Sequence, residues 1–276
     1  MRFDYTTVGH VTADVMSDGS RRPGGSAFYS ALQAARMGQR TLIVTRGAPR
    51  EIEELVEPYR DELELEILPA AQTTTLQSSG SGATRTQRVL AWAGAIGEEV
   101  DLDTSILHLA PVARETPGHL QGRADFVGLT PQGLVRAWAG EAGDIFPAPP
   151  DAHRIPERCD AVALSEHERA SCADLISRAR ETGAIVAVTA GASATTILLP
   201  GGGAQAVEVP AVEDPGDDVG AGDVFAAAFF LALAEGRAPG RAAAFANAAA
   251  GVRMSGAGPG AIGGRAAVEA RLLAGA

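Results

Sequence analysis

The chain has 276 residues, of which 46% are hydrophobic and only 5% aromatic, and it contains 33 glycines. This composition is typical of helices packed closely on a sheet, and it excludes a disordered chain or a coiled coil. The formal net charge is −11, and all 23 basic residues are arginines because no lysine is present. We therefore exclude a Walker A lysine and a Schiff-base lysine, and we expect no nucleic-acid or membrane partner.

The ends of the chain and its cysteines bear on its location. The first residues lack a basic region followed by an apolar run, and no apolar stretch reaches the ~20 residues needed to span a bilayer. Cys159 and Cys172 are too few for a disulfide framework. These features predict a cytoplasmic protein with reduced thiols.

The first third of the chain alternates strand and helix patterns. In order, we expect a strand at 3–9, a helix at 26–37, a strand at 41–45, a polar helix at 51–60 and a strand at 63–68. This order indicates an α/β fold with a parallel sheet. Two threonine-rich segments, 73–79 and 84–92, are joined by a glycine-containing turn, which predicts a hairpin that covers a site as a lid.

The alternation resumes after this hairpin. Short apolar strands are expected at 106–109, 126–129, 161–165 and 185–189, with a helix at 168–181 before the last of them. A second hairpin, 194–199 with 206–209, is followed by three helices at 221–235, 239–252 and 265–273. No composition shift requires a domain boundary, so we expect one domain over residues 1–276.

The most informative segment lies near residue 220. Gly220, Ala221 and Gly222 open an almost wholly apolar helix, and Asp223 lies in its first turn. Small residues let the backbone amides of a helix N-terminus approach an anion, and burial of the helix strengthens its positive end. An aspartate at this place often only caps the helix. In this context we expect a base beside an anion hole.

The run Gly220-Ala221-Gly222-Asp223 before an apolar helix resembles the C-terminal signature of the ribokinase-like (PfkB) carbohydrate kinases. The resemblance implies that Asp223 is the catalytic base and that the preceding amides form the anion hole. It also implies a three-layer α/β/α sandwich with a mainly parallel central sheet and a small β lid. Further matches run in the family's order over nearly the whole chain.

These matches imply roles for more residues. Substrate-binding residues would be Asp14, Gly24, Gly25 and Tyr29; nucleotide-binding residues would be Thr189, Gly191 and Asn247; and Glu168 would help to hold Mg²⁺. The chain departs from the family pattern at Asp218, Val219 and Ser165, where the family commonly has threonine or asparagine.

The function that the resemblance implies is transfer of the γ-phosphate of ATP, with Mg²⁺, to a hydroxyl of a small sugar or polyol. The segment from Gly24 to Tyr29 also resembles, more weakly, the myo-inositol kinase branch, and so does the serine at position 165. A nucleoside kinase of the same fold and a non-catalytic binding protein of that fold are the alternatives, and we expect a monomer or a homodimer. Asp14 opposite an aromatic wall favours a neutral ring polyol as acceptor.

Overall fold

A nine-stranded sheet forms the centre of the molecule. The computed structural model describes residues 2–16, 18–80, 86–98, 100–213 and 215–275. The strand order across the sheet is β16 (Ala204–Val207), β15 (Ser193–Leu198), β14 (Ile185–Ala190), β13 (Ala161–Ser165), β9 (Gln121–Leu129), β8 (Asp101–Leu109), β1 (Phe3–Val8), β4 (Thr41–Gly47) and β5 (Glu64–Pro69). Every pairing from β14 to β5 is parallel, whereas β15 pairs antiparallel with both of its neighbours, β14 and β16.

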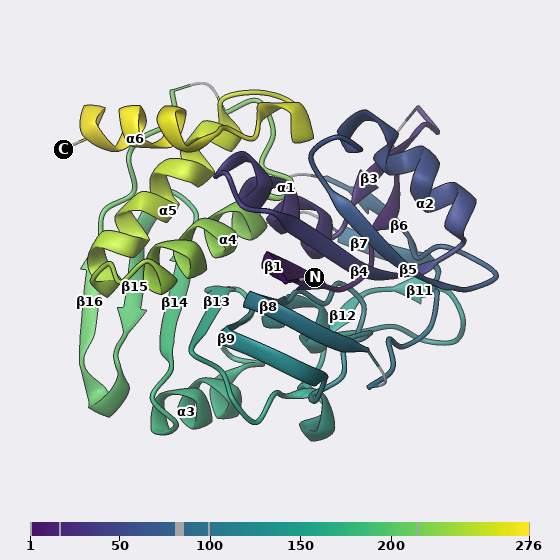
Figure 1. Ribbon diagram of the computed structural model, residues 1–276, viewed down its shortest axis with the longest axis horizontal. Helices are drawn as coiled ribbons and strands as arrows, with labels where there is room; N and C mark the ends of the chain where they lie inside the picture. Colours follow the sequence, from purple (N-terminus) through teal and green to yellow (C-terminus); the bar gives the residue numbers. More distant parts are fainter. Residues whose placement is uncertain (1, 17, 81–85, 99, 214, 276) are drawn as a thin grey trace.

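Helices cover both faces of this sheet (Figure 1). On one side lie α1 (Ser26–Arg36), α4 (Ala221–Ala234), α5 (Pro239–Met254) and α6 (Arg265–Ala274), and α3 (Ala173–Glu181) lies on the other. A separate buried apolar cluster fills each side. The expected α/β/α sandwich is therefore confirmed. No helix in the described ranges is long and apolar enough to cross a membrane.

The position of α4 follows from its composition. Every side chain from Val224 to Ala232 is buried, so this part of the helix has no solvent face and fits only in the interior. Gly128 on β9 makes room for it, because a Cβ atom there would lie 2.4 Å from the ring of Phe230. The aromatic ring thus packs directly on the sheet backbone.

A second, five-stranded sheet lies beside the first. Its order is β11 (Gly143–Asp144), β7 (Thr86–Ala91), β6 (Thr75–Ser79), β2 (Thr12–Val15) and β3 (Arg21–Gly24). The expected hairpin is present as the antiparallel pair β6–β7, and its tip, including Arg85, lies outside the described residues. Strand β11 covers the outer edge of β7, where Arg88 and Asp144 lie 3.7 Å apart. Helix α2 (Pro49–Val56) packs against β2 and β3.

Candidate active site

The predicted site residues follow the carboxyl ends of the parallel strands. Asp14 comes after β1, Glu168 after β13, and Thr189 stands near the end of β14. Parallel strands end at the same edge of a sheet, and ligands of open α/β folds bind at that edge. The topology therefore brings these residues together, although up to 175 positions separate them in the sequence.

The N-terminus of α4 has the shape that the sequence indicates. Gly220 adopts a left-handed conformation with φ 78°, and a Cβ atom there would lie 2.1 Å from Tyr29 Cδ1. Gly222 differs, because a Cβ atom there would meet no described atom within 4 Å. The amide of Ala221 donates to the Asp218 carbonyl oxygen at 3.2 Å, which closes the turn. The amides of Gly222 and Asp223 come next along the first turn of α4.

Asp223 has the electrostatics of a general base. Burial raises the pKa of its carboxyl from 3.8 to about 6. The Ser26 hydroxyl and the Arg136 guanidinium oppose this rise, whereas the charges of Glu168 and Asp14 add to it. The carboxyl is thus ionised at neutral pH but retains more basicity than an exposed aspartate, which suits it to accept a proton.

Arg136 is a residue of the candidate site that the motifs did not predict. It follows the 3-10 helix η3 (Pro131–Val135) and is half-buried, and its Nη1 donates to the Val112 carbonyl oxygen at 3.2 Å. Burial lowers its pKa, and the charges of Glu168, Asp223, Glu115 and Asp14 oppose that effect. The charges of four carboxylates therefore act on this guanidinium. Its one sequence signal is an arginine directly after the apolar pair Leu134-Val135.

Glu115 fixes the loop that holds Arg136. Its fully buried carboxylate accepts hydrogen bonds from the amides of His10, Val112 and Ala113 at 2.6–3.1 Å. These bonds join the segment after β8 to the segment after β1. The Val112 carbonyl oxygen that accepts from Arg136 is held in place by this network.

Asp14 lies on β2 opposite the glycine pair. The Thr12 hydroxyl donates to Asp14 Oδ1 at 2.7 Å. A Cβ atom at Gly24 would lie 2.2 Å from Asp14 Oδ2, so only glycine leaves room for the carboxylate. Gly25 takes φ 91° and directly precedes α1. Tyr29 is 5% exposed, with its ring beneath Gly220 and edge-on to Phe28.

Glu168 turns back towards its own strand. Its carboxylate accepts a hydrogen bond from the Ser165 amide at 2.7 Å, and turns fill the residues up to α3. The helix expected from residue 168 therefore begins only at Ala173, because the carboxylate caps the strand end instead. Within the described ranges, no group of three or more His, Cys, Asp or Glu side chains could bind a metal ion. A Mg²⁺ ion at Glu168 would need phosphate oxygens and water as further ligands, which is how this ion is commonly held.

A cavity of about 340 Å³ adjoins the start of α4. Thr189, Gly191 and Asn247 line it, as does Gly222, and apolar residues at 209–212 and Met254 cover much of its wall. The Thr195 hydroxyl donates to Asn247 Oδ1 at 2.9 Å, and Asn247 Nδ2 donates to the Glu208 carbonyl oxygen at 3.1 Å. The cavity thus joins the three expected nucleotide residues to the expected anion hole.

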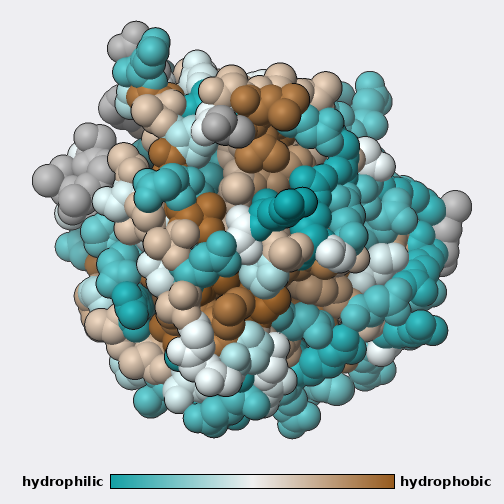
Figure 2. Space-filling model, turned by 90° about the vertical axis from the view of Figure 1, so that its left-hand side faces the viewer, coloured by the Kyte–Doolittle hydropathy of each residue, from teal (hydrophilic) through white to brown (hydrophobic). Residues whose placement is uncertain are grey.

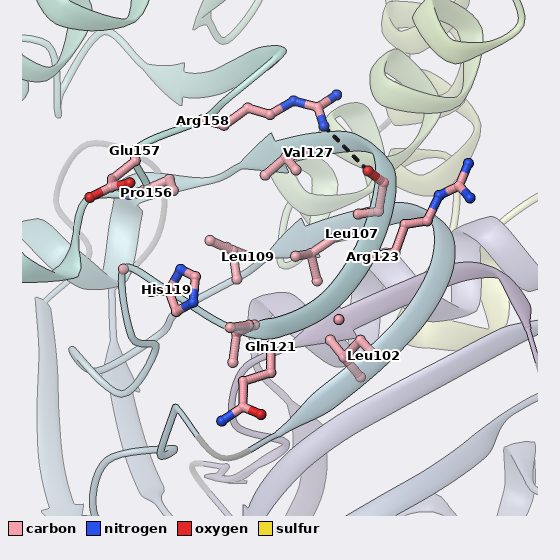
Figure 3. Close-up of a pocket in the computed structure, with 14 residues that line it drawn as sticks. Leu102, Leu107, Leu109, His119, Gln121, Arg123, Val127, Pro156, Glu157 and Arg158 are labelled. Atoms are coloured by element: carbon pink, nitrogen blue, oxygen red, sulfur yellow. Dashed lines mark hydrogen bonds between the residues drawn. The ribbon is translucent and has the colours of Figure 1, made fainter.

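Two other cavities differ in their relation to this site. A cavity of about 530 Å³ is lined by Arg136 and Glu168 and by residues of β7, so it adjoins the site from the side of the second sheet. Another, of about 350 Å³, lies where β8 and β9 are joined without a helix (Figure 3). Leu102, Leu107 and Leu109 project into it, and Arg158 on its rim donates to the Ala124 carbonyl oxygen. No predicted site residue lines it.

The face that bears the β16 edge has hydrophobic patches set in a mostly hydrophilic surface (Figure 2). The charges of Arg136, Glu168 and Asp14, by contrast, act on the pKa of Asp223. The chemistry is therefore concentrated at the carboxyl edge of the strands.

Comparisons with known proteins agree with this architecture. Residues 152–262 match the family model of pfkB family carbohydrate kinases. No curated protein matches the sequence.

Three solved structures illustrate the likeness. A ribokinase from Arabidopsis thaliana, complexed with ribose and ATP, is 17% identical over 99% of both chains, with a TM-score of 0.72. A pyrophosphate-dependent myo-inositol kinase is 19% identical over 97% of this chain and 98% of its own, also at 0.72.

The third is a nucleoside kinase from Methanocaldococcus jannaschii, which is 16% identical over 98% of both chains, with a TM-score of 0.71. Identities this low show the fold, whereas the family match rests on the segment that contains Gly220 to Asp223 and Asn247. The resemblance seen in the motifs is confirmed: the chain has the ribokinase fold and carries the pfkB carbohydrate kinase match in its C-terminal part.

Proposed function

We propose that the protein transfers the terminal phosphoryl group of ATP, with Mg²⁺, to a hydroxyl of a small neutral sugar or polyol. The observation that carries this proposal is the carboxyl of Asp223, whose pKa is about 6 and which lies at the N-terminus of α4. On one side is the 340 Å³ cavity, and Asp14 is close enough to influence the same carboxyl. The arrangement supports a base between a donor and an acceptor.

The reaction follows from these groups. The ionised Asp223 carboxylate accepts the proton of the acceptor hydroxyl as its oxygen attacks the terminal phosphorus in line. The amides of Gly222 and Asp223 bind the transferring group, and the dipole of α4 favours the charge that gathers there. Arg136 supplies the positive charge that a lysine would otherwise supply. Mg²⁺ near Glu168 would neutralise donor phosphates when bound.

The donor assignment is supported by the cavity beside Gly222. Its wall at 209–212 and Met254 is largely apolar, which suits the face of a nucleotide base, whereas pyrophosphate would gain nothing from it. The acceptor assignment is supported by Asp14, which can accept two hydrogen bonds from neighbouring hydroxyls. We further propose that residues 1–276 act as one cytoplasmic kinase domain, as a monomer or homodimer, and that the five-stranded sheet is the lid over the acceptor.

A substrate matrix tests the proposal. Ribose, fructose, myo-inositol and nucleosides are each incubated with ATP or pyrophosphate, with and without Mg²⁺, and phosphorylated product is measured. We expect turnover of a neutral ring polyol with ATP and Mg²⁺ only. Turnover with pyrophosphate but not with ATP would show that pyrophosphate is the donor. A preference for nucleosides would show that the acceptor is a nucleoside. Nucleotide binding without any product would favour a non-catalytic binding protein.

A further inference from the structure

A fully buried arginine lies behind the anion hole, and the mechanism above does not use it. Arg253, near the end of α5, has no exposed surface. Its Nη2 donates to Asp217 Oδ2 at 2.9 Å and to the Val219 carbonyl oxygen at 2.7 Å. Its Nη1 donates to the carbonyl oxygens of Gly256 at 3.2 Å and of Asp217 at 3.4 Å. One guanidinium is thus surrounded by three carbonyl oxygens and a carboxylate.

These partners belong to two loops that meet behind the start of α4. The Asp217 carboxylate also accepts the amides of Val219 at 2.9 Å and of Gly258 at 3.3 Å. Burial alone would raise the pKa of Asp217, but the Val219 amide and Arg253 keep it below its usual value. The carboxylate and guanidinium therefore remain a charged pair. Together they join the loop at 216–220 to the loop at 255–258.

The pair acts directly on the position of the anion hole. Val219, whose carbonyl oxygen accepts from Arg253, precedes Gly220, the residue before α4. The other side of Gly220 is closed by Tyr29, and the centre of the Arg253 guanidinium lies 5.7 Å from the centroid of the same ring. Gly220 is thus held between two residues that Arg253 contacts. A shift of this segment would move the amides of Gly222 and Asp223 with it.

The four oxygens also have the chemistry of a site for a small cation. Backbone carbonyls and carboxylates are the groups that replace the hydration shell of alkali and alkaline-earth ions in proteins. Here the guanidinium of Arg253 occupies the centre of the four oxygens. A guanidinium offers five fixed donors and stays charged, so it satisfies several oxygens without an ion from solution.

We propose that Arg253 is a positioning residue that serves as a built-in cation for the anion-hole loop. The protein then needs no monovalent metal ion for phosphoryl transfer, and removal of the guanidinium creates a dependence on small cations. This inference rests on the proposed phosphoryl transfer for its kinetic consequence, but its structural consequence, occupation of the vacated place by a cation, does not.

Arg253→Ala tests the proposal against a matched control. Arg36 also donates to three carbonyl oxygens, those of Pro259, Gly260 and Ile262, and pairs with Glu62, so these partners lie outside the Val219–Gly220 segment. Rates are measured in potassium, sodium, guanidinium and tetramethylammonium chlorides at equal ionic strength. Wild type is expected to vary by no more than about twofold. Arg253→Ala should lose ~10²-fold in kcat in tetramethylammonium and regain ~10-fold or more with potassium or guanidinium. Arg36→Ala should show no such response.

A second readout does not depend on transfer. Without any substrate, potassium or guanidinium at low concentration should raise the unfolding temperature of Arg253→Ala relative to tetramethylammonium, and should leave wild type and Arg36→Ala unchanged. If no acceptor is ever phosphorylated, the proposed function fails while this measurement still decides the role of Arg253. If Arg253→Ala does not fold, Arg253→Lys replaces it: one ammonium reaches fewer oxygens, so kcat should fall with little change in donor KM.

Three outcomes would overturn the inference. The first is activation of wild type by potassium well beyond twofold. The second is an Arg253→Ala protein that folds but responds to no small cation in either readout, which would leave only a structural role. The third is wild-type kinetics for Arg253→Ala, or for Arg253→Lys where that variant replaces it.

Discussion

The hydroxyl of Ser30 donates a hydrogen bond to the carbonyl oxygen of Asp223 at 3.1 Å, and this bond joins the second turn of α1 to the first turn of α4. Helix α1 begins at Ser26 and α4 at Ala221, so their N-termini lie side by side at the carboxyl edge of the sheet. Two positive helix ends therefore act on the same small volume. This arrangement favours a phosphate there, and α1 has no acidic residue in its first turn.

The first prediction concerns Asp223 as a base. Asp223→Asn keeps the shape of the side chain but cannot accept a proton, so kcat should fall by ~10²–10⁴-fold. In wild type, kcat/KM should rise with pH through about 6, as the carboxyl ionises, and then level off. A turnover number within a few-fold of wild type for the asparagine variant would contradict the assignment.

The same carboxyl should reduce stability at neutral pH. Its pKa is raised from 3.8 to about 6 on folding, so the unfolded chain binds fewer protons between these values. The free energy of unfolding should then fall as pH rises through this window, by roughly 2–3 kcal/mol in all. Asp223→Asn should therefore be more stable than wild type at pH 7 but not near pH 4. Denaturant unfolding at both pH values measures the difference.

The second prediction separates two glycines that lie two positions apart. Gly222→Val places its side chain in open space beside the 340 Å³ cavity, so the fold should persist while kcat/KM for ATP falls by ~10²-fold. Gly220→Ala should instead destabilise the fold, because position 220 has φ 78° and the added methyl group would clash with the Tyr29 ring. We expect it to lower the free energy of unfolding by about 2–5 kcal/mol. Normal ATP kinetics in a stable Gly222→Val variant would argue against the anion hole.

The third prediction concerns Arg136. Arg136→Met removes the positive charge that opposes the rise in the pKa of Asp223. The acid limb of the pH–rate profile should move above 6, and kcat should fall by ~10²-fold as the transferring group loses a countercharge. Arg158→Met is the control, since Arg158 is exposed and donates to the Ala124 and Asp125 carbonyl oxygens at the remote cavity. An unmoved profile for Arg136→Met would place this arginine outside the site.

The fourth prediction concerns the acceptor. Asp14→Ala should raise KM for the best polyol and lower kcat, by between ~10-fold and ~10²-fold in kcat/KM. Gly24→Ala should have a similar effect, because its methyl group would lie 2.2 Å from Asp14 Oδ2. Asp18→Ala, on the exposed turn between β2 and β3, should change neither constant. Unchanged kinetics in Asp14→Ala would remove this residue from the acceptor site.

The sequence predicted those parts of the fold whose signals are local. The helix that begins at Ala221 was found because its glycines, its aspartate and its apolar run are contiguous. Strands β2 and β3 were missed: each has only four residues, and β2 pairs with β6 some 60 positions later. Their mixed composition of Asp, Arg and Pro gives no alternating pattern.

The same distinction applies to the site. Arg136 and Arg253 were not predicted, because the groups that define their roles lie 24 and 34–36 positions away, at Val112, Val219 and Asp217. Only the folded chain shows that carboxylate charges act on Arg136 and that oxygens enclose Arg253.

The contact between Gly128 and Phe230 has a consequence for where the reaction takes place. Phe230 lies seven residues beyond Asp223 on α4, about 10 Å along the helix axis, and its ring rests on the backbone of β9. The backbone of β9 thereby limits how closely α4 can approach the sheet. A methyl group at Gly128 would push α4 outward and carry Asp223 with it, so a strand position with no functional group of its own sets how deep the proposed base lies in the site.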